Sequence, residues 1–189
     1  MIAACEQSLH RLQTDYIDLY LLHWPGSVPF EATVEGARVL LDQGKIRAFC
    51  ISNFDTDGLQ QIIDAGLGDL VSVNQVMHNM PHRGVELDLF PLMAKHDVTA
   101  VAYSPLEIGP TRAIRGMQDL ASDENLSVAQ LVLAWHMTRS LAVPIPKASQ
   151  IEHFDDLAAA AQVVLSQSTL DRIDALAPAP PRPVPLEVR

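Results

Sequence analysis

Polar side chains that could do chemistry follow several apolar runs of this sequence, each at the point where the run ends. The run Tyr16–Leu22 stops at His23, and Pro25 holds the residue before it extended. An imidazole at such a strand end can donate or accept a hydrogen bond with a bound carbonyl group. Packing of the ring beneath a loop is the structural alternative. The residue types alone leave both interpretations of His23 open.

Two further apolar runs end on amide and hydroxyl side chains. Ser52 and Asn53 follow the segment Ile46–Ile51, and Gln75 closes the segment Val71–Gln75. Groups of this kind can hold a planar carboxamide through both its donor edge and its acceptor edge. Serine and asparagine also cap helices routinely, so capping of the following helices is the alternative.

An aromatic ring and a lysine are associated with the last two runs. Tyr103, at the end of Val98–Tyr103, can present a flat ring for stacking, or can lie at a rim with a solvated hydroxyl. Lys147 follows the run Leu141–Ile145 and precedes a helical segment. The region after the last strands of a barrel is a common phosphate site, although a solvated lysine has the same sequence signature.

Helical patterns separate these five strand-like runs and must position the side chains at their ends. The expected helices cover residues 3–12, 31–43, 57–64, 85–95, 113–121, 128–138, 152–161 and 169–176. Strands that alternate with helices indicate parallel strands joined by right-handed crossovers. Because the runs are continuously apolar, we expect both faces of the sheet to be covered. A doubly wound sheet and a (β/α)8 barrel both satisfy this pattern.

The ends of the strands favour the barrel. Each of the five carries chemistry-capable groups at or just beyond its carboxyl end, which is where barrel enzymes place their active sites. No GxGxxG motif follows any of the strands, and this weakens the doubly wound alternative. We therefore expect an α/β fold of the (β/α)8 TIM-barrel type, with only about five of the eight strands in this chain. A partial barrel domain should cover residues 1–176, with a Pro-rich tail over residues 177–189.

Composition excludes several classes of protein. The formal net charge of −10 argues against a nucleic-acid partner and against an anionic membrane surface. No apolar run is long enough to span a bilayer, and no signal-peptide pattern is present. Cys5 and Cys50 form no CxxC pair, so we expect a reducing cytoplasm. His78 and His82 are four residues apart, but Pro81 prevents a shared helical face, and we expect no metal site.

Taken together, five segments of the sequence resemble the aldo-keto reductase superfamily. They are, in order, SLHRLQTDYIDLYLLHWP, GKIRAFCISNF, SVNQ, AYSPL and VPIPKAS. The resemblance covers nearly the whole chain and, within the family, is closest to bacterial enzymes that reduce small aldehydes and dicarbonyls. It implies a (β/α)8 barrel and reversible hydride transfer between NADPH and the carbonyl of a small substrate, with NADH as a possible cofactor.

The resemblance also assigns roles to individual residues. His23 matches the histidine that orients the substrate carbonyl, and Trp24 matches a wall of the substrate pocket. The remaining matches concern the cofactor. They are Ser52, Asn53 and Gln75 for the nicotinamide carboxamide, Tyr103 for stacking on the nicotinamide, Ser104 and Leu106 for the pyrophosphate, and Lys147 and Ser149 for the adenosine 2′-phosphate.

Departures from the family pattern concern the adenosine end of the cofactor. His153 stands where the family often has an arginine, six residues after the lysine. Asp156 and Leu157 stand where a Glu-Asn pair usually clasps the adenine. The preference for NADPH over NADH is therefore open. The short Pro-rich tail predicts an open pocket and broad use of small carbonyls.

The larger departure is that the family's catalytic aspartate, tyrosine and lysine precede the matched segments and have no counterpart here. Without a proton donor, hydride transfer would lack its general acid, at a cost of roughly 10²–10⁴-fold in rate. Five parallel strands cannot close a barrel, so open apolar edges should favour self-association. The chain is then a fragment of a reductase, a subunit completed by another chain, or a remnant with different packing. A catalytically silent nucleotide-binding or scaffold subunit and an unrelated barrel enzyme are the alternative functions.

Overall fold

The computed structural model describes all residues from Met1 to Arg189 and confirms the expected alternation of strands and helices. The strands are β1 (Ile17–Leu22), β2 (Ile46–Ser52), β3 (Val71–Met77), β4 (Thr99–Tyr103) and β5 (Val143–Pro144). The helices are α1 (Ile2–Leu12), α2 (Phe30–Asp42), α3 (Thr56–Asp64), α4 (Leu89–Lys95), α5 (Ile108–Ala113), α6 (Met117–Asp123), α7 (Val128–Arg139), α8 (Ile151–Ala160) and α9 (Gln167–Leu176). Two 3₁₀ turns, η1 (Gly68–Leu70) and η2 (Gly84–Glu86), complete the chain.

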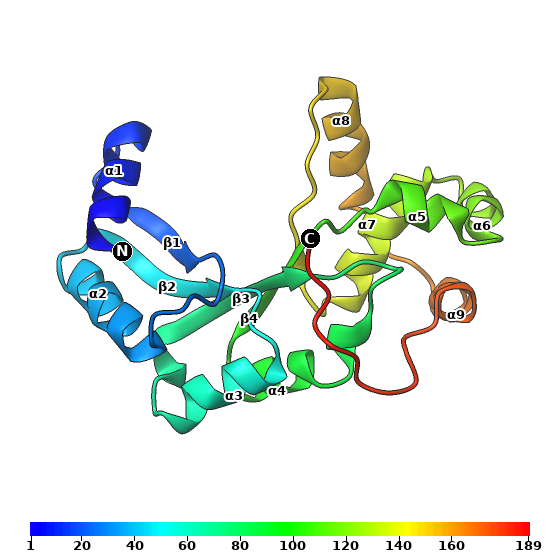
Figure 1. Cartoon of the computed structure of the whole chain (residues 1–189). Coiled ribbons are helices and arrows are strands. Elements are labelled where there is room, and N and C mark those ends of the chain that lie inside the picture. The colour runs from blue at the N-terminus through cyan, green and yellow to red at the C-terminus, as the bar shows by residue number, and fades with distance from the viewer. The chain divides into compact units, whose positions relative to one another are not determined.

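The chain divides into two compact units, which are described separately. Unit 1 comprises Met1–Gln75 with Leu92–Thr99, and unit 2 comprises Val76–Pro91 with Ala100–Arg189. In unit 1, β1 pairs in parallel with β2, and β2 pairs in parallel with β3. Figure 1 shows α1 and α2 beside the first two of these strands, and both helices contribute to the unit's core.

The helices of unit 1 begin and end for local reasons. In α2, the side chains of Val34, Ala37 and Leu40 recur at helical spacing and are buried, so this face covers the sheet. Helix α3 begins at the N-cap Asp55, whose carboxylate accepts a hydrogen bond from the backbone N–H of Gly58 at 2.8 Å. Helix α2 follows β1 and helix α3 follows β2, so the loops at the carboxyl ends of these two strands lead into these helices.

In unit 2, β4 pairs in parallel with β5, and α7 is the central helix. Helix α7 is buried on nearly all sides, and its N-cap Ser127 forms a reciprocal capping box with Gln130. The side chain of Trp135 on this helix is fully buried. Side chains of α6, α7 and α9 pack together around it and form the main hydrophobic cluster of the unit.

Two predicted helices were wrong in their bounds. The segment 85–95 contains the short turn η2 followed by α4, because the Asp88 carboxylate accepts from the Leu89 N–H and starts a new helix there. In the segment 113–121, α5 ends at Ala113 and α6 begins only at Met117, after its N-cap Gly116, which has a left-handed backbone with φ of 86°. The last strand is shorter than expected, and Pro144 within it has no N–H to extend the ladder.

The Pro-rich C-terminal segment lies against the rest of unit 2. His82 Nδ1 is 2.8 Å from the carboxylate of Glu187, and the Arg189 guanidinium donates to the Glu107 carboxylate at 2.9 Å. Among all the helices of the chain, none has the length and apolar character that crossing a membrane would require.

Candidate functional site

The strand ends of unit 1 bring four of the sequence-predicted residues together. Parallel pairing places Ser52 opposite Gln75, and it places Leu22, the residue before His23, opposite Ile51. The side chains of Ser52 and Asn53 are buried, and Gln75 is half-buried. The carboxyl ends of β1, β2 and β3 therefore present His23, Ser52, Asn53 and Gln75 as one cluster, called here the strand-end cluster.

Hydrogen bonds to backbone carbonyls hold this cluster. The Ser52 hydroxyl donates to the Gln75 carbonyl at 2.9 Å, and the Asn53 backbone N–H donates to the same carbonyl at 2.9 Å. The Asn53 side-chain amide donates to the His23 carbonyl at 3.0 Å and to the Ser52 hydroxyl oxygen at 3.1 Å. Asn53 has a left-handed backbone with φ of 63°, a conformation that asparagine tolerates better than most residues.

Neither helix capping nor packing beneath a loop accounts for the residues of the strand-end cluster. Asp55 caps helix α3, so helix capping does not account for Ser52 and Asn53. The side chain of His23 is exposed beyond the end of β1, so the ring is not packed beneath a loop. Trp24 is 42% exposed, and its ring centroid lies 5.9 Å from that of His23. Both rings are accessible to a ligand in this unit.

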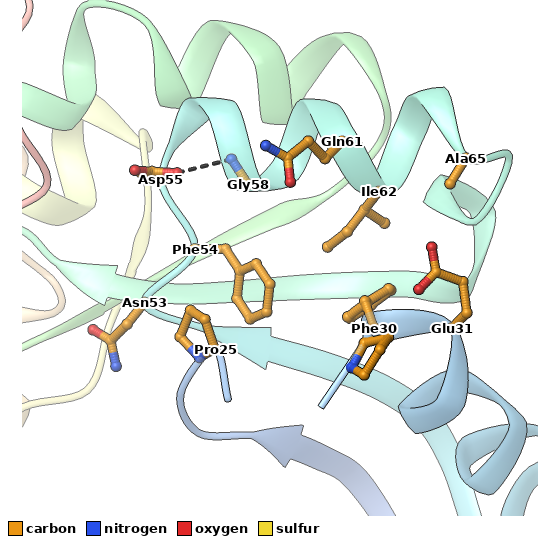
Figure 2. Close-up of a pocket in the computed structure, with 11 residues that line it drawn as sticks. Pro25, Phe30, Glu31, Asn53, Phe54, Asp55, Gly58, Gln61, Ile62 and Ala65 are labelled. Carbon is orange, nitrogen blue, oxygen red and sulfur yellow. Dashed lines mark hydrogen bonds between the residues drawn. The ribbon is translucent and has the colours of Figure 1, made fainter. Parts of the chain in front are cut away.

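A pocket of about 520 Å³ adjoins the strand-end cluster in unit 1 (Figure 2). Pro25, Phe30 and Phe54 form its apolar wall, with Asn53 and Pro25 at one end and Ala65 at the other. The Asp55 carboxylate within it is already engaged by Gly58, as the dashed line in Figure 2 marks. Glu31 and Gln61 also line the pocket, so its lining is partly polar, and its size suits a small organic ligand.

In unit 2, Tyr103 and Ser104 lie at the end of β4. Burial raises the pKa of the half-buried Tyr103, and a hydrogen bond with the backbone of Arg189 partly offsets that rise. Ser104 has a left-handed backbone with φ of 48°, and its carbonyl accepts from the Asn79 side chain at 3.1 Å. The turn after β4 is therefore fixed by a buried asparagine and by the C-terminal segment.

A second pocket, of about 430 Å³, lies wholly in unit 2 and is called here the basic pocket. Four sequence-predicted residues line it, namely Leu106, Lys147, His153 and Asp156. The other lining residues are Ile108, Arg112, Ser127, Ala129 and Leu157. Ser149, which was predicted for the same ligand group, is exposed and does not line the pocket.

The charges of the basic pocket favour an anion. Arg112, Lys147 and His153 form no ion pair and donate no side-chain hydrogen bond in this structure. Asp156, the only carboxylate in the lining, accepts a hydrogen bond from the Ser127 hydroxyl at 3.1 Å. A phosphate group fits a pocket whose cations are unpaired and whose carboxylate is engaged. These residues therefore fit the phosphate-bearing end of a nicotinamide cofactor.

Sequence reasoning missed Arg112 because it assigned no role to the residues between Leu106 and the next expected helix. The available signal was a basic residue two positions after Gly109-Pro110, directly downstream of a predicted phosphate segment. The turn is anchored by Thr111, which is buried and whose hydroxyl donates to the Leu106 carbonyl at 3.1 Å.

A buried ionic network, also missed, lies elsewhere in unit 2. The Arg83 guanidinium donates to the carboxylate of Glu86 at 2.8 Å and 2.9 Å, and to that of Asp174 at 2.8 Å. His78 Nε2 lies 2.9 Å from Glu86 Oε1, the oxygen that also accepts from Arg83 Nε. Burial alone would raise the pKa of Glu86, but the hydrogen bonds from His78 and Arg83 outweigh it and lower that pKa to about 2. His78 and His82 contact different carboxylates, and no group of three His, Cys, Asp or Glu side chains is placed to hold a metal ion.

Comparison with known proteins places these features in a family. Residues 1–178 match the sequence model of the Aldo/keto reductase family. The chain is 41% identical over 186 residues to the methylglyoxal reductase YeaE of Escherichia coli, and 36% identical over 176 residues to the glyoxal reductase of Bacillus subtilis. These alignments cover 95% and 93% of this chain, but only 65% and 62% of those two proteins.

Solved structures agree with the sequence comparison. A Klebsiella pneumoniae aldo-keto reductase in complex with NADPH is 40% identical, with a TM-score of 0.91 over 98% of this chain and 67% of that chain. A structure of aldo/keto reductase from the same organism with NADP and acetate has a TM-score of 0.92. The chain belongs to the aldo/keto reductase family, and its α/β fold, with five parallel strands, is part of that family's TIM barrel.

Proposed function

We propose that this chain is the cofactor-binding part of an NADPH-dependent oxidoreductase that reduces small aldehydes and dicarbonyls to alcohols. The observation that carries the proposal is the strand-end cluster, in which Asn53 links His23 to Ser52 and Gln75 through hydrogen bonds of 2.9–3.1 Å. The unpaired cations of the basic pocket support the cofactor assignment. The relatives named for methylglyoxal and glyoxal support a small carbonyl substrate.

Each set of residues would hold a different part of the reactants. When bound, NADPH supplies the hydride that reduces the carbonyl carbon. The exposed His23 would hydrogen-bond the carbonyl oxygen of the substrate beside Trp24. The amide and hydroxyl groups of Ser52, Asn53 and Gln75 would hold the nicotinamide carboxamide. The assignments in unit 2 are Tyr103 for stacking, Ser104 and Leu106 for the pyrophosphate, Lys147, Ser149 and His153 for the 2′-phosphate, and Asp156 for the adenine.

The proposal assigns the role of proton donor to no residue of this chain. The resemblance identifies only His23 among the family's catalytic groups. A general acid contributes roughly 10²–10⁴-fold to such a reaction, so its absence predicts cofactor binding with little turnover. A catalytically silent nucleotide-binding subunit is therefore the second candidate function.

The proposal also includes a cytoplasmic location. The two cysteines, Cys5 and Cys50, are buried and free, which is consistent with a reducing compartment.

Turnover and cofactor binding by the purified chain separate these two candidates. Oxidation of NADPH would be followed at 340 nm with methylglyoxal, and cofactor binding would be followed separately by fluorescence. The matched variants are His23→Ala and His10→Ala, because His10 is an exposed histidine on α1 outside the cluster. Turnover lost only in His23→Ala supports the reductase. Binding without turnover supports the silent subunit, and no binding of NADPH or NADH contradicts both.

A further inference from the structure

The basic pocket brings an arginine and a lysine into one lining, although the chain as a whole is acidic. The chain carries 23 acidic side chains against 13 lysines and arginines. Several other arginines make close ion pairs, for example Arg172 with Asp123 at 2.6 Å and Arg139 with Asp174 at 2.9 Å. Arg112 and Lys147 instead line one pocket without a carboxylate partner. Such an arrangement leaves both cations available to an anionic ligand.

The basic side chains of this pocket come from different elements. Lys147 precedes α8 and His153 lies in its first turn, whereas Arg112 belongs to α5. The hydrogen bond from Thr111 to the Leu106 carbonyl anchors the backbone directly before Arg112. The pocket therefore has a cation on α5 that is independent of the segment containing Lys147.

The guanidinium of Arg112 also compensates for a departure noted in the sequence. His153 occupies the position at which an arginine was expected from the family resemblance, so that segment offers no guanidinium. A guanidinium presents a planar fork of donors that matches two phosphate oxygens, which an imidazole does not. Arg112 lines the same pocket as His153 and supplies this group from α5.

We propose that Arg112 is a further specificity-determining residue, which binds the ribose 2′-phosphate of the cofactor together with Lys147 and thereby selects NADPH over NADH. This inference rests on the proposed function, because it concerns the adenosine end of the same cofactor. NADH has a hydroxyl group where NADPH has the phosphate, so it gains little from a second cation. Removal of the Arg112 charge should therefore lower the affinity for ligands that carry a 2′-phosphate more than the affinity for ligands that lack it.

Two nucleotide fragments test this without involving the nicotinamide. Calorimetry would measure the affinities of 2′,5′-ADP, which carries the 2′-phosphate, and of 5′-AMP, which lacks it. A charge-assisted hydrogen bond contributes about 1.5–3 kcal/mol, so Arg112→Gln should lower the affinity for 2′,5′-ADP by about 10- to 100-fold. The affinity for 5′-AMP should change by less than about 2-fold. Arg112→Lys should restore part of the loss, because it keeps the charge without the fork.

The matched control is Arg115→Gln, because Arg115 is also an exposed arginine three residues away but does not line the pocket. It should leave both affinities unchanged. The proposal would be overturned if Arg112→Gln lowered the affinities for both probes equally, or if Arg115→Gln had the same effect as Arg112→Gln. It would also be overturned if the wild-type chain bound both probes with equal affinity, or bound neither. Selective loss of 2′,5′-ADP in a chain that never turns over NADPH would uphold Arg112 and contradict only the reductase function.

Discussion

Replacement of Glu86 should destabilise unit 2 because this carboxylate is buried and bonded on several sides. Its side chain is only 8% exposed and is bonded by His78 and Arg83, whose own side chains are 2% and 3% exposed. The fall of its pKa from 4.5 to about 2 corresponds to about 3 kcal/mol, at 1.36 kcal/mol per unit. Breaking a buried ion pair by removing one partner costs about 3–5 kcal/mol in general. Glu86→Gln should therefore lower the free energy of unfolding at pH 7 by about 3 kcal/mol.

Urea unfolding followed by tryptophan fluorescence measures this loss. Trp135 is fully buried with the Arg83 guanidinium 5.4 Å from its ring, so it reports on the network directly. A Trp24→Phe background removes the signal of the exposed tryptophan. Glu6→Gln is the control, because Glu6 pairs with Lys45 at 2.6 Å but is half exposed, and such pairs contribute about 1 kcal/mol or less. A loss for Glu86→Gln no larger than that for Glu6→Gln would refute the reasoning.

Two further predictions concern acid stability and association. Burial, and then the nearby His78, lower the pKa of His136 to about 3, although the Pro105 carbonyl and Glu86 act in the opposite direction. The folded chain therefore keeps this imidazole neutral, while the unfolded chain binds a proton below about pH 6.5. The free energy of unfolding should therefore fall as pH decreases from about 6.5 toward 3, less steeply in His136→Gln, and parallel profiles for the two proteins would contradict this. In unit 1, β1 pairs only with β2, and Leu19 on this strand is 48% exposed. If the chain self-associates through this edge, Leu19→Lys should reduce the fraction of associated protein measured by sedimentation velocity. Leu12→Lys, at an exposed leucine on α1, should leave it unchanged, and an unchanged distribution in both variants would argue against the β1 edge as the contact.

The strand ends of unit 1 were predictable because their signals are local. Each run is mainly apolar and ends at or beside a polar residue, so the sequence locates the carboxyl end of the strand within a residue or two. Parallel pairing then brings these ends to the same edge of the sheet. This is why His23, Ser52, Asn53 and Gln75 could be predicted to be neighbours although Gln75 lies 52 positions after His23.

The helices that follow β3 and β4 were less predictable because one residue redirects the backbone there. The Asp88 carboxylate starts α4, and the left-handed Gly116 separates α5 from α6. Hydrophobic periodicity runs through both points without interruption, so it indicates one helix where two elements exist. Arg112 was missed because no helix was expected over residues 108–113, where α5 places it in the lining of the basic pocket.

The buried network shows a different limit of sequence reasoning. Arg83 and Glu86 are three residues apart, but the third charge, Asp174, is 91 positions after Arg83 and comes from α9. Charged residues are rarely buried, so a pattern of exposed charges is the ordinary expectation for each of them. The packing of Trp135 on α7 near the Arg83 guanidinium accompanies the burial of Arg83 and Glu86, whereas Asp174 stays 42% exposed. The network thus ties α9 to the rest of unit 2 through Asp174, which accepts from both Arg83 and Arg139.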